Sequence, residues 1–126
     1  MKEKIVDLRK QVIDYLQNEL QTPAEYLWKK FPTYAVFRNE RNNKWFAAIM
    51  NIDFNKIDSS KQGKIDVLAI KCDPFMQGSL LEKPGFYPAY HFNKNNWITI
   101  LLNGEVPLEQ IFKLTNLSYN IVENQK

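Results

Sequence analysis

Apolar side chains recur at steps of three and four residues near the start of the chain, which predicts an amphipathic helix over 2–19. Its apolar stripe consists of Ile5, Leu8, Val12, Tyr15, Leu16 and Leu20. The next segment, 22–33, opens with Thr-Pro-Ala-Glu, which has the form of a capping box. Because Pro32 follows closely, only a short helical turn and a loop are expected there.

Two β-prone runs, 34–38 and 44–50, lie on either side of the turn-forming residues 39–43. This pattern predicts a β-hairpin with a basic tip. Residues 53–64 are polar and show no clear period, so they are expected to form an exposed loop. A third strand is predicted over 65–71.

An acidic residue followed by proline marks the start of a second helix at Asp73 and Pro74. This helix is predicted to run to about Glu82, because Pro84 and Gly85 then end it.

The runs 87–92 and 97–102 predict a second hairpin with an Asn-rich, basic tip at 93–96. A final helix is expected after Pro107, with the apolar stripe Leu108, Ile111, Phe112, Thr115, Tyr119 and Val122. The element order is therefore α-β-β-β-α-β-β-α. It favours an α+β two-layer sandwich, a mainly antiparallel sheet with helices on one side.

The composition is that of one ordinary globular domain over residues 1–126, with 44% hydrophobic and 25% charged residues. Charges interrupt the N-terminus, and no apolar run approaches the roughly 20 residues that span a membrane. Cys72 is the single cysteine, which excludes an intrachain disulfide and favours a reducing compartment. We therefore expect a cytoplasmic protein without membrane association.

Positive charge is concentrated in the middle of the chain, where nine Lys or Arg stand against four acidic residues between Lys29 and Lys71. The whole chain carries a formal net charge of +3. Such a distribution is typical of a binding face for an anionic partner, but a solvated sheet rim has the same composition. Both interpretations stay open at this stage.

The residue types available do not favour metal, nucleotide or cofactor chemistry. One histidine and one cysteine are too few for a transition-metal site, and four scattered glycines do not form a phosphate-binding loop. No metal, cofactor or catalytic residue is therefore assigned. An enzyme hypothesis rests on Cys72 with His91 alone, and a cysteine at a strand end is more often a small buried apolar residue.

The residues around His91 combine aromatic, asparagine and lysine side chains. Within a strand, His91 would point away from the side chains of both neighbours, either to solvent or into the helix-covered face. Asn93 and Lys94 are suited to phosphate or base edges, and Tyr90 or Trp97 to stacking on a base. A structural histidine beside a solvated turn with aromatic cross-strand pairs is the alternative.

An ordered set of motifs over nearly the whole chain resembles the MmcQ/YjbR family. The motifs are Lys-Cys-Asp-Pro at 71–74, Pro-Ala-Tyr-His-Phe-Asn-Lys at 88–94, Trp-Ile-Thr at 97–99, Leu-Asn-Gly-Glu-Val-Pro at 102–107 and Leu-Ser-Tyr at 117–119, with a weaker match over 33–38 and 45–47. The resemblance implies a CyaY-like fold, similar to the bacterial frataxin homologues, with two hairpin wings expected to contact DNA.

Two features limit what the resemblance carries over. Many relatives have a histidine at the position of Asn96, so a shared site there would be altered in this chain. Frataxins are thought to hold iron on an acidic helix ridge, whereas residues 2–19 mix acidic and basic side chains. An iron chaperone role is therefore disfavoured.

Two functional hypotheses follow. The first is non-enzymatic DNA binding by two basic wings, with phosphate contacts from Arg38, Arg41, Lys44, Asn93 and Lys94. The alternative is a small-molecule or peptide-binding module whose pocket lies around Tyr90, His91, Lys94 and Trp97, with Lys71 as a further candidate.

Overall fold

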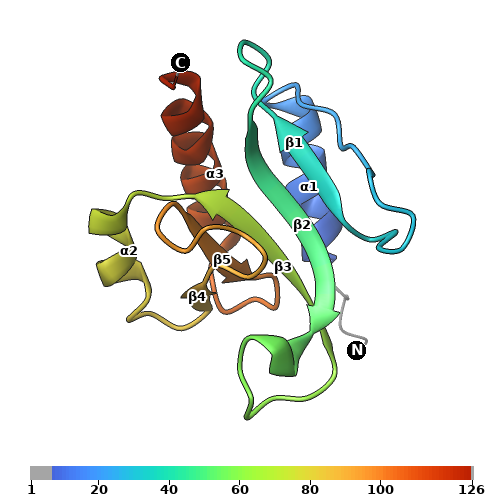
Figure 1. Cartoon of the computed structure of the whole chain (residues 1–126), viewed down its shortest axis with the longest axis vertical. Coiled ribbons are helices and arrows are strands. Elements are labelled where there is room, and N and C mark those ends of the chain that lie inside the picture. Colours follow the sequence, from blue (N-terminus) through green and yellow to red (C-terminus); the bar gives the residue numbers. More distant parts are fainter. Residues whose placement is uncertain (1–6, 126) are drawn as a thin grey trace, which may run out of the picture.

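A computed structural model describes residues 7–125, which form a five-stranded antiparallel sheet accompanied by three α-helices (Figure 1). The strands lie in the order β1-β2-β3-β5-β4. In chain order the elements are α1 (Leu8–Asn18), β1 (Ala35–Arg38), β2 (Trp45–Asp53), the 3-10 helix η1 (Phe54–Lys56), β3 (Lys64–Lys71), α2 (Pro74–Leu80), β4 (Phe86–Pro88), β5 (Trp97–Leu101) and α3 (Leu108–Glu123). The predicted α+β class and element order are confirmed.

The helices cover one face of the sheet, with α1 and α3 behind the strands in Figure 1. Their stripes bury Val12, Leu16, Ile111, Leu114 and Val122 in a core that also receives Leu80 from α2. A buried hydroxyl ties α3 to two strands, because Ser118 Oγ donates to the carbonyl of Phe46 (2.6 Å) and accepts from the backbone N–H of Lys71 (2.8 Å). Such paired buried polar groups fix the position of the helix on the sheet.

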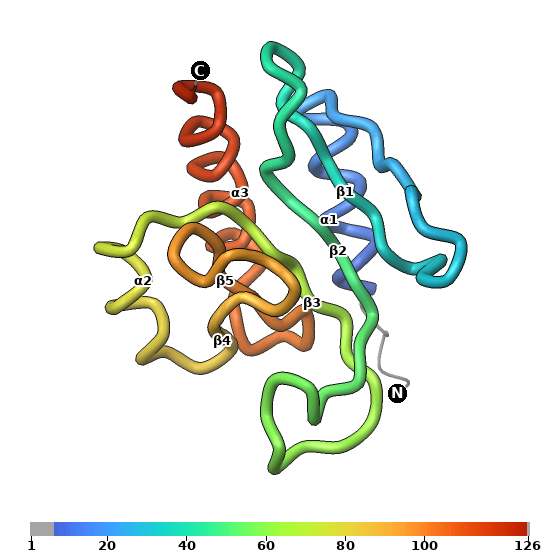
Figure 2. Tube along the Cα trace, in the orientation of Figure 1, coloured from blue at the N-terminus to red at the C-terminus, as the bar shows by residue number. Residues whose placement is uncertain are grey.

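The opposite face of the sheet also buries an apolar cluster, although none of the three described α-helices packs on it. Its buried members include Val36, Ala48, Met50, Val67, Ala69, Trp97 and Leu101. Side chains from loops, strands and the 3-10 helix η1 cover them, namely Tyr34, Trp45, Phe54, Ile57, Tyr87, Tyr90 and Phe92. Figure 2 shows that the chain between β4 and β5 folds back over the sheet. We call this side the loop-covered face.

The second hairpin differs from its prediction. Strands β4 and β5 do pair, with Tyr87 opposite Thr99, but β4 ends at Pro88 and residues 89–96 form a loop. The prediction of a strand to residue 92 is therefore wrong. His91 has a positive φ of 70°, which a regular strand does not accommodate, and the side chain of Asn93 closes a turn by accepting from the N–H of Asn95.

Three further boundaries differ. The expected helical turn in 22–33 does not form, because Glu25 instead exchanges two backbone hydrogen bonds with Val36 at the edge of the sheet. Strand β2 continues through Asp53 into the predicted loop. The first helix spans Leu8–Asn18, while residues 2–6 of its predicted range lie outside the described part of the chain. Within residues 7–125, no helix is long and apolar enough to cross a lipid bilayer.

Candidate functional site

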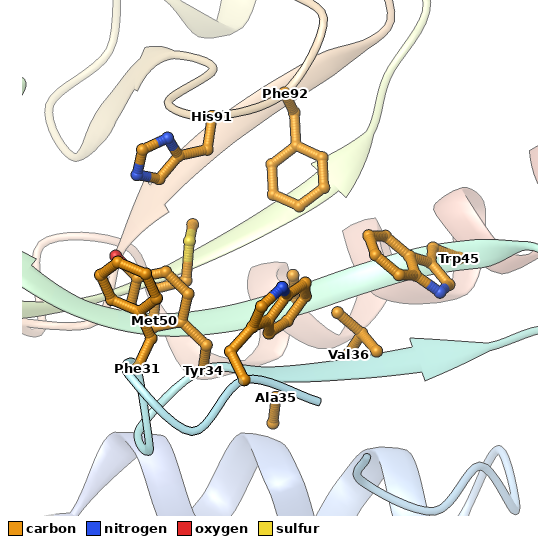
Figure 3. A pocket seen from close by; sticks show the side chains of 10 residues that line it. Phe31, Tyr34, Ala35, Val36, Trp45, Met50, His91 and Phe92 are labelled. Carbon is orange, nitrogen blue, oxygen red and sulfur yellow. The ribbon is translucent and has the colours of Figure 1, made fainter. Parts of the chain in front are cut away.

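A pocket of about 240 Å³ opens on the loop-covered face, between the first hairpin and the loop 89–96. It is lined by Trp28, Phe31, Tyr34, Ala35, Val36, Trp45, Ala48, Met50, His91 and Phe92. Six of these ten residues carry a ring, so we call it the aromatic pocket. Figure 3 shows His91 and Phe92 on one side, and Phe31 and Tyr34 on the opposite side.

The floor of the aromatic pocket comes from alternating positions of the first two strands. Val36, Ala48 and Met50 are almost fully buried and belong to the cluster under the loops. Side chains at every second position of a strand share a face, and small or flexible ones here leave room above the sheet.

The outer wall is built by the segment that precedes β1. Trp28 meets Tyr34 and Trp45 edge to face, at centroid distances of 6.2 and 5.8 Å, and Phe31 stacks on Tyr34 at 4.8 Å. Trp28 and Phe31 nevertheless keep 36% and 47% of their surface exposed. Large apolar side chains at a hollow and still open to solvent are typical of a binding surface.

This segment is held at the sheet edge by backbone and charged contacts. Glu25 pairs with Val36 through two backbone hydrogen bonds of 3.0 Å, and its carboxylate accepts from Arg38 Nε at 3.0 and 3.1 Å. The pocket wall is therefore anchored at Glu25, a few residues before Trp28.

The inner wall depends on a strained residue. His91 adopts the left-handed conformation, which a residue with a side chain adopts at an energetic cost. Its ring lies 4.0 Å from that of Tyr90 and 6.3 Å from that of Tyr34. The side chain is exposed rather than buried, so core packing does not explain the strain.

A row of rings continues from the pocket across the sheet. Trp45 contacts Phe92 edge to face at 6.4 Å, and Phe92 stacks on Trp97 at 4.4 Å. We call these three residues the aromatic row. A cation lies over each end, since Arg38 Cζ is 5.7 Å from the Trp45 centroid and Lys71 Nζ is 5.3 Å from that of Trp97.

The structure brings together only some of the residues predicted for a ligand pocket. His91 lines the aromatic pocket, Tyr90 lies beside it, and Trp97 with Lys71 lies behind Phe92. Lys94 is exposed on the same loop, outside the pocket lining.

The residues predicted to contact phosphates are dispersed. Arg38 is paired with Glu25, while Arg41 is 75% exposed and 3.9 Å from a carboxylate oxygen of Glu123. Lys44 is half-buried and close enough to Lys71 for its charge to lower the pKa of that lysine. Asn93 is exposed, and its side-chain oxygen accepts a hydrogen bond from the backbone N–H of Asn95 within the same loop.

Five ring-bearing residues of the pocket were not predicted as site residues: Trp28, Phe31, Tyr34, Trp45 and Phe92. A sequence signal exists for Trp28 and Phe31, because both rings lie in the segment 22–33, which strand and helix patterns leave mostly as a loop. The three tryptophans of the chain, at 28, 45 and 97, all lie in the aromatic pocket or the aromatic row.

The geometry separates the two residues of the enzyme hypothesis. Cys72 is buried in the core beneath the helices, whereas His91 lies on the loop-covered face. Burial raises the pKa of the Cys72 thiol to about 11, with a further contribution from Asp73. A buried thiol of this kind is not an activated nucleophile.

Comparisons with known proteins identify the relatives of this chain. The YjbR family model matches residues 20–121. The uncharacterised protein YyaQ of Bacillus subtilis (strain 168) is 31% identical over 115 residues, which cover 91% of this chain and 98% of YyaQ.

Solved structures agree with this result. A crystal structure of a protein from Pseudomonas syringae has a TM-score of 0.86 and 45% identity over 90% of this chain and 97% of that one. A solution NMR structure of a protein from the same species has a TM-score of 0.82 and 43% identity over 94% and 96%. Protein DR2400 of Deinococcus radiodurans shares the fold, with a TM-score of 0.64 and 24% identity over 93% and 77%. Since the family model covers most of the chain and YyaQ matches it along nearly its full length, this chain belongs to the YjbR family.

Proposed function

We propose that this protein is a binding module that takes a planar aromatic group of its ligand into the aromatic pocket. The observation that supports this most is the set of six ring side chains around one solvent-open hollow. Rings bind other rings by offset or edge-to-face contact, and a concave apolar site with few polar groups is the usual form of a small-molecule pocket.

The polar group suited to orient such a ligand is His91. Its imidazole offers a donor and an acceptor at the mouth of a lining that is otherwise largely apolar. Strain retained at an exposed residue is consistent with a role in binding, because function is a common reason for an unfavourable backbone conformation to persist.

Nucleic acid is the second candidate ligand, favoured by the exposure of Lys94 on the same loop that supplies His91. The aromatic pocket suits an unstacked base better than the stacked bases of a duplex. Because Arg38 already pairs with Glu25, its charge is less suited to a phosphate contact, which argues against DNA binding by two basic hairpin wings alone. A titration of single-stranded and duplex DNA across several salt concentrations separates these forms, and no binding even at low salt excludes both.

The proposed pocket is tested by adding the planar probes adenine and adenosine to the folded protein. Because Trp28 and Trp45 line the pocket and Trp97 stacks on Phe92 behind it, a bound ring is expected to change tryptophan fluorescence, and it should raise the melting temperature. Trp28→Ala is expected to abolish both effects. Phe75→Ala is the matched control, since Phe75 is 95% exposed and outside the pocket lining. The proposal fails if neither probe has an effect, or if Trp28→Ala responds like the native protein.

A further inference from the structure

The two cations of the aromatic row differ in their partners. The guanidinium of Arg38 donates to both carboxylate oxygens of Glu25 and to the carbonyl of Asn43, so its charge is compensated. Among residues 7–125, no carboxylate forms an ion pair with Lys71. The row therefore has one neutralised end and one positively charged end.

The position of Lys71 is fixed by its backbone. It stands opposite Trp97 in the pairing of β3 with β5, and its N–H is held by the hydroxyl of Ser118. The side chain is partly buried, with its ammonium over the indole of Trp97. A charged group held on an apolar ring surface keeps fewer water contacts than one on a mobile exposed side chain.

The electrostatics around this ammonium favour an anion. Burial is the main cause that lowers the pKa of Lys71, and the positive charge of Lys44 lowers it further. Both effects penalise the charged lysine in the unliganded protein. A negative group placed beside it would offset that penalty, since an opposite charge favours the ionised form.

We infer that the ligand of the aromatic pocket carries a negatively charged group that binds at Lys71. Phe92 lines the ring-binding hollow and stacks on Trp97, whose ring centroid lies 5.3 Å from the ammonium of Lys71, so the ligand would extend from the hollow toward Lys71 along the aromatic row. This inference rests on the proposed function. A free mononucleotide and a nucleotide within a single strand share the required chemistry of a planar ring joined to a phosphate.

The test compares a neutral ring with the same ring carrying a phosphate, using adenosine and adenosine 5′-monophosphate. The native protein is expected to bind the monophosphate about ten-fold more tightly, the size of one charge-assisted contact in a partly exposed site. Lys71→Met is expected to bind both probes equally. Lys71→Arg should keep the preference, because it restores the charge.

Lys94→Met is the matched control, since it removes an exposed lysine from the neighbouring loop and should leave the ten-fold preference intact. Adenosine binding by Lys71→Met serves as the check that the fold and the pocket persist. A single-stranded hexadeoxyadenylate distinguishes the sources, because a strand ligand predicts tighter binding than the monophosphate and a free ligand predicts the reverse.

Each outcome bears on a separate claim. If adenosine and its monophosphate bind equally to the native protein, or if Lys71→Met keeps the preference, the anion site is wrong while the pocket stands. If neither probe binds, the proposed function itself is overturned, and the inference falls with it.

Discussion

The phenyl ring of Phe92 stacks on the indole of Trp97, with centroids 4.4 Å apart and planes inclined by 28°. Phe92 lines the aromatic pocket, while Trp97 is buried in the sheet and has the ammonium of Lys71 5.3 Å from its ring centroid. The contact therefore joins the loop 89–96 to strand β5. It makes the pocket wall depend on the sheet beneath it.

Phe92→Ala should accordingly affect both stability and binding. Removing a half-buried ring that contacts Trp45 and Trp97 is expected to lower the free energy of unfolding by about 1–3 kcal/mol. Binding of the adenosine probe should weaken as well, because one wall of the pocket is lost. Urea denaturation measures the first effect and fluorescence titration the second. Phe92→Leu, which retains apolar bulk, should recover most of the stability, and equal losses in both variants would contradict this role.

Substitutions at the strained residue His91 can distinguish a structural role of this residue from a role in binding. Glycine adopts a φ of 70° without steric cost, so His91→Gly is expected to change the free energy of unfolding by no more than about 1 kcal/mol. The same variant should bind adenosine more weakly. His91→Asn is the matched variant, because asparagine tolerates the left-handed conformation and keeps a polar group. A large loss of stability in His91→Gly with unchanged binding would show that the residue is structural.

Substitutions at two glycines, Gly85 and Gly78, test the backbone conformation of the fold. Gly85 has a φ of 90°, and an added Cβ would lie 2.6 Å from Val106 Cγ2, so Gly85→Ala should destabilise the protein by about 1–3 kcal/mol. Gly78 lies within helix α2 with open space around it, and Gly78→Ala should stabilise by up to about 1 kcal/mol. Thermal or urea unfolding measures both, and effects of the same sign would contradict the backbone described for these positions.

The Cys72 thiol gives a pH-dependent prediction. Its pKa is raised from 9.0 to about 11, mainly by burial, and only the thiolate is nucleophilic. Alkylation by iodoacetamide in the native protein should therefore rise with pH near 11, whereas the unfolded chain should show this rise near 9. Because the unfolded chain loses this proton first, the contribution of Cys72 to the free energy of unfolding should fall between pH 9 and 11. Cys72→Ala lacks that contribution, and fast native alkylation at neutral pH would refute the assignment.

Periodicity predicted the elements that bury a regular stripe or alternating face. Helices α1 and α3 follow the apolar spacing that includes Val12, Leu16 and Ile111, and the central strands follow their β-branched runs. The loop 89–96 was predicted incorrectly because its aromatic residues have a high propensity for strands. The positive φ at His91 and the turn at Asn93 depend on local backbone chemistry and tertiary contacts, which the sequence pattern does not report.

Only the part of the site that lies in a recognisable sequence motif could be predicted. The family motif at 88–94 contains His91, which does line the pocket. Trp28 and Phe31 come from a loop with no periodic signal, and only their contacts with Tyr34 and Trp45 show that they belong to the same surface. The ion pair between Arg38 and Glu25 could not be predicted from the sequence either, because the fold, and not a regular sequence spacing, brings the two residues together.

The most direct test of the aromatic pocket is a two-dimensional 1H–15N NMR titration of the native protein with adenosine 5′-monophosphate. The account predicts progressive shifts of the indole N–H signals of Trp28 and Trp45 and of the backbone amide of His91, with no shift at Phe75. Shifts gathered instead at the hollow between α1 and α3, around Tyr15 and Phe112, would contradict it, as would a spectrum that does not change.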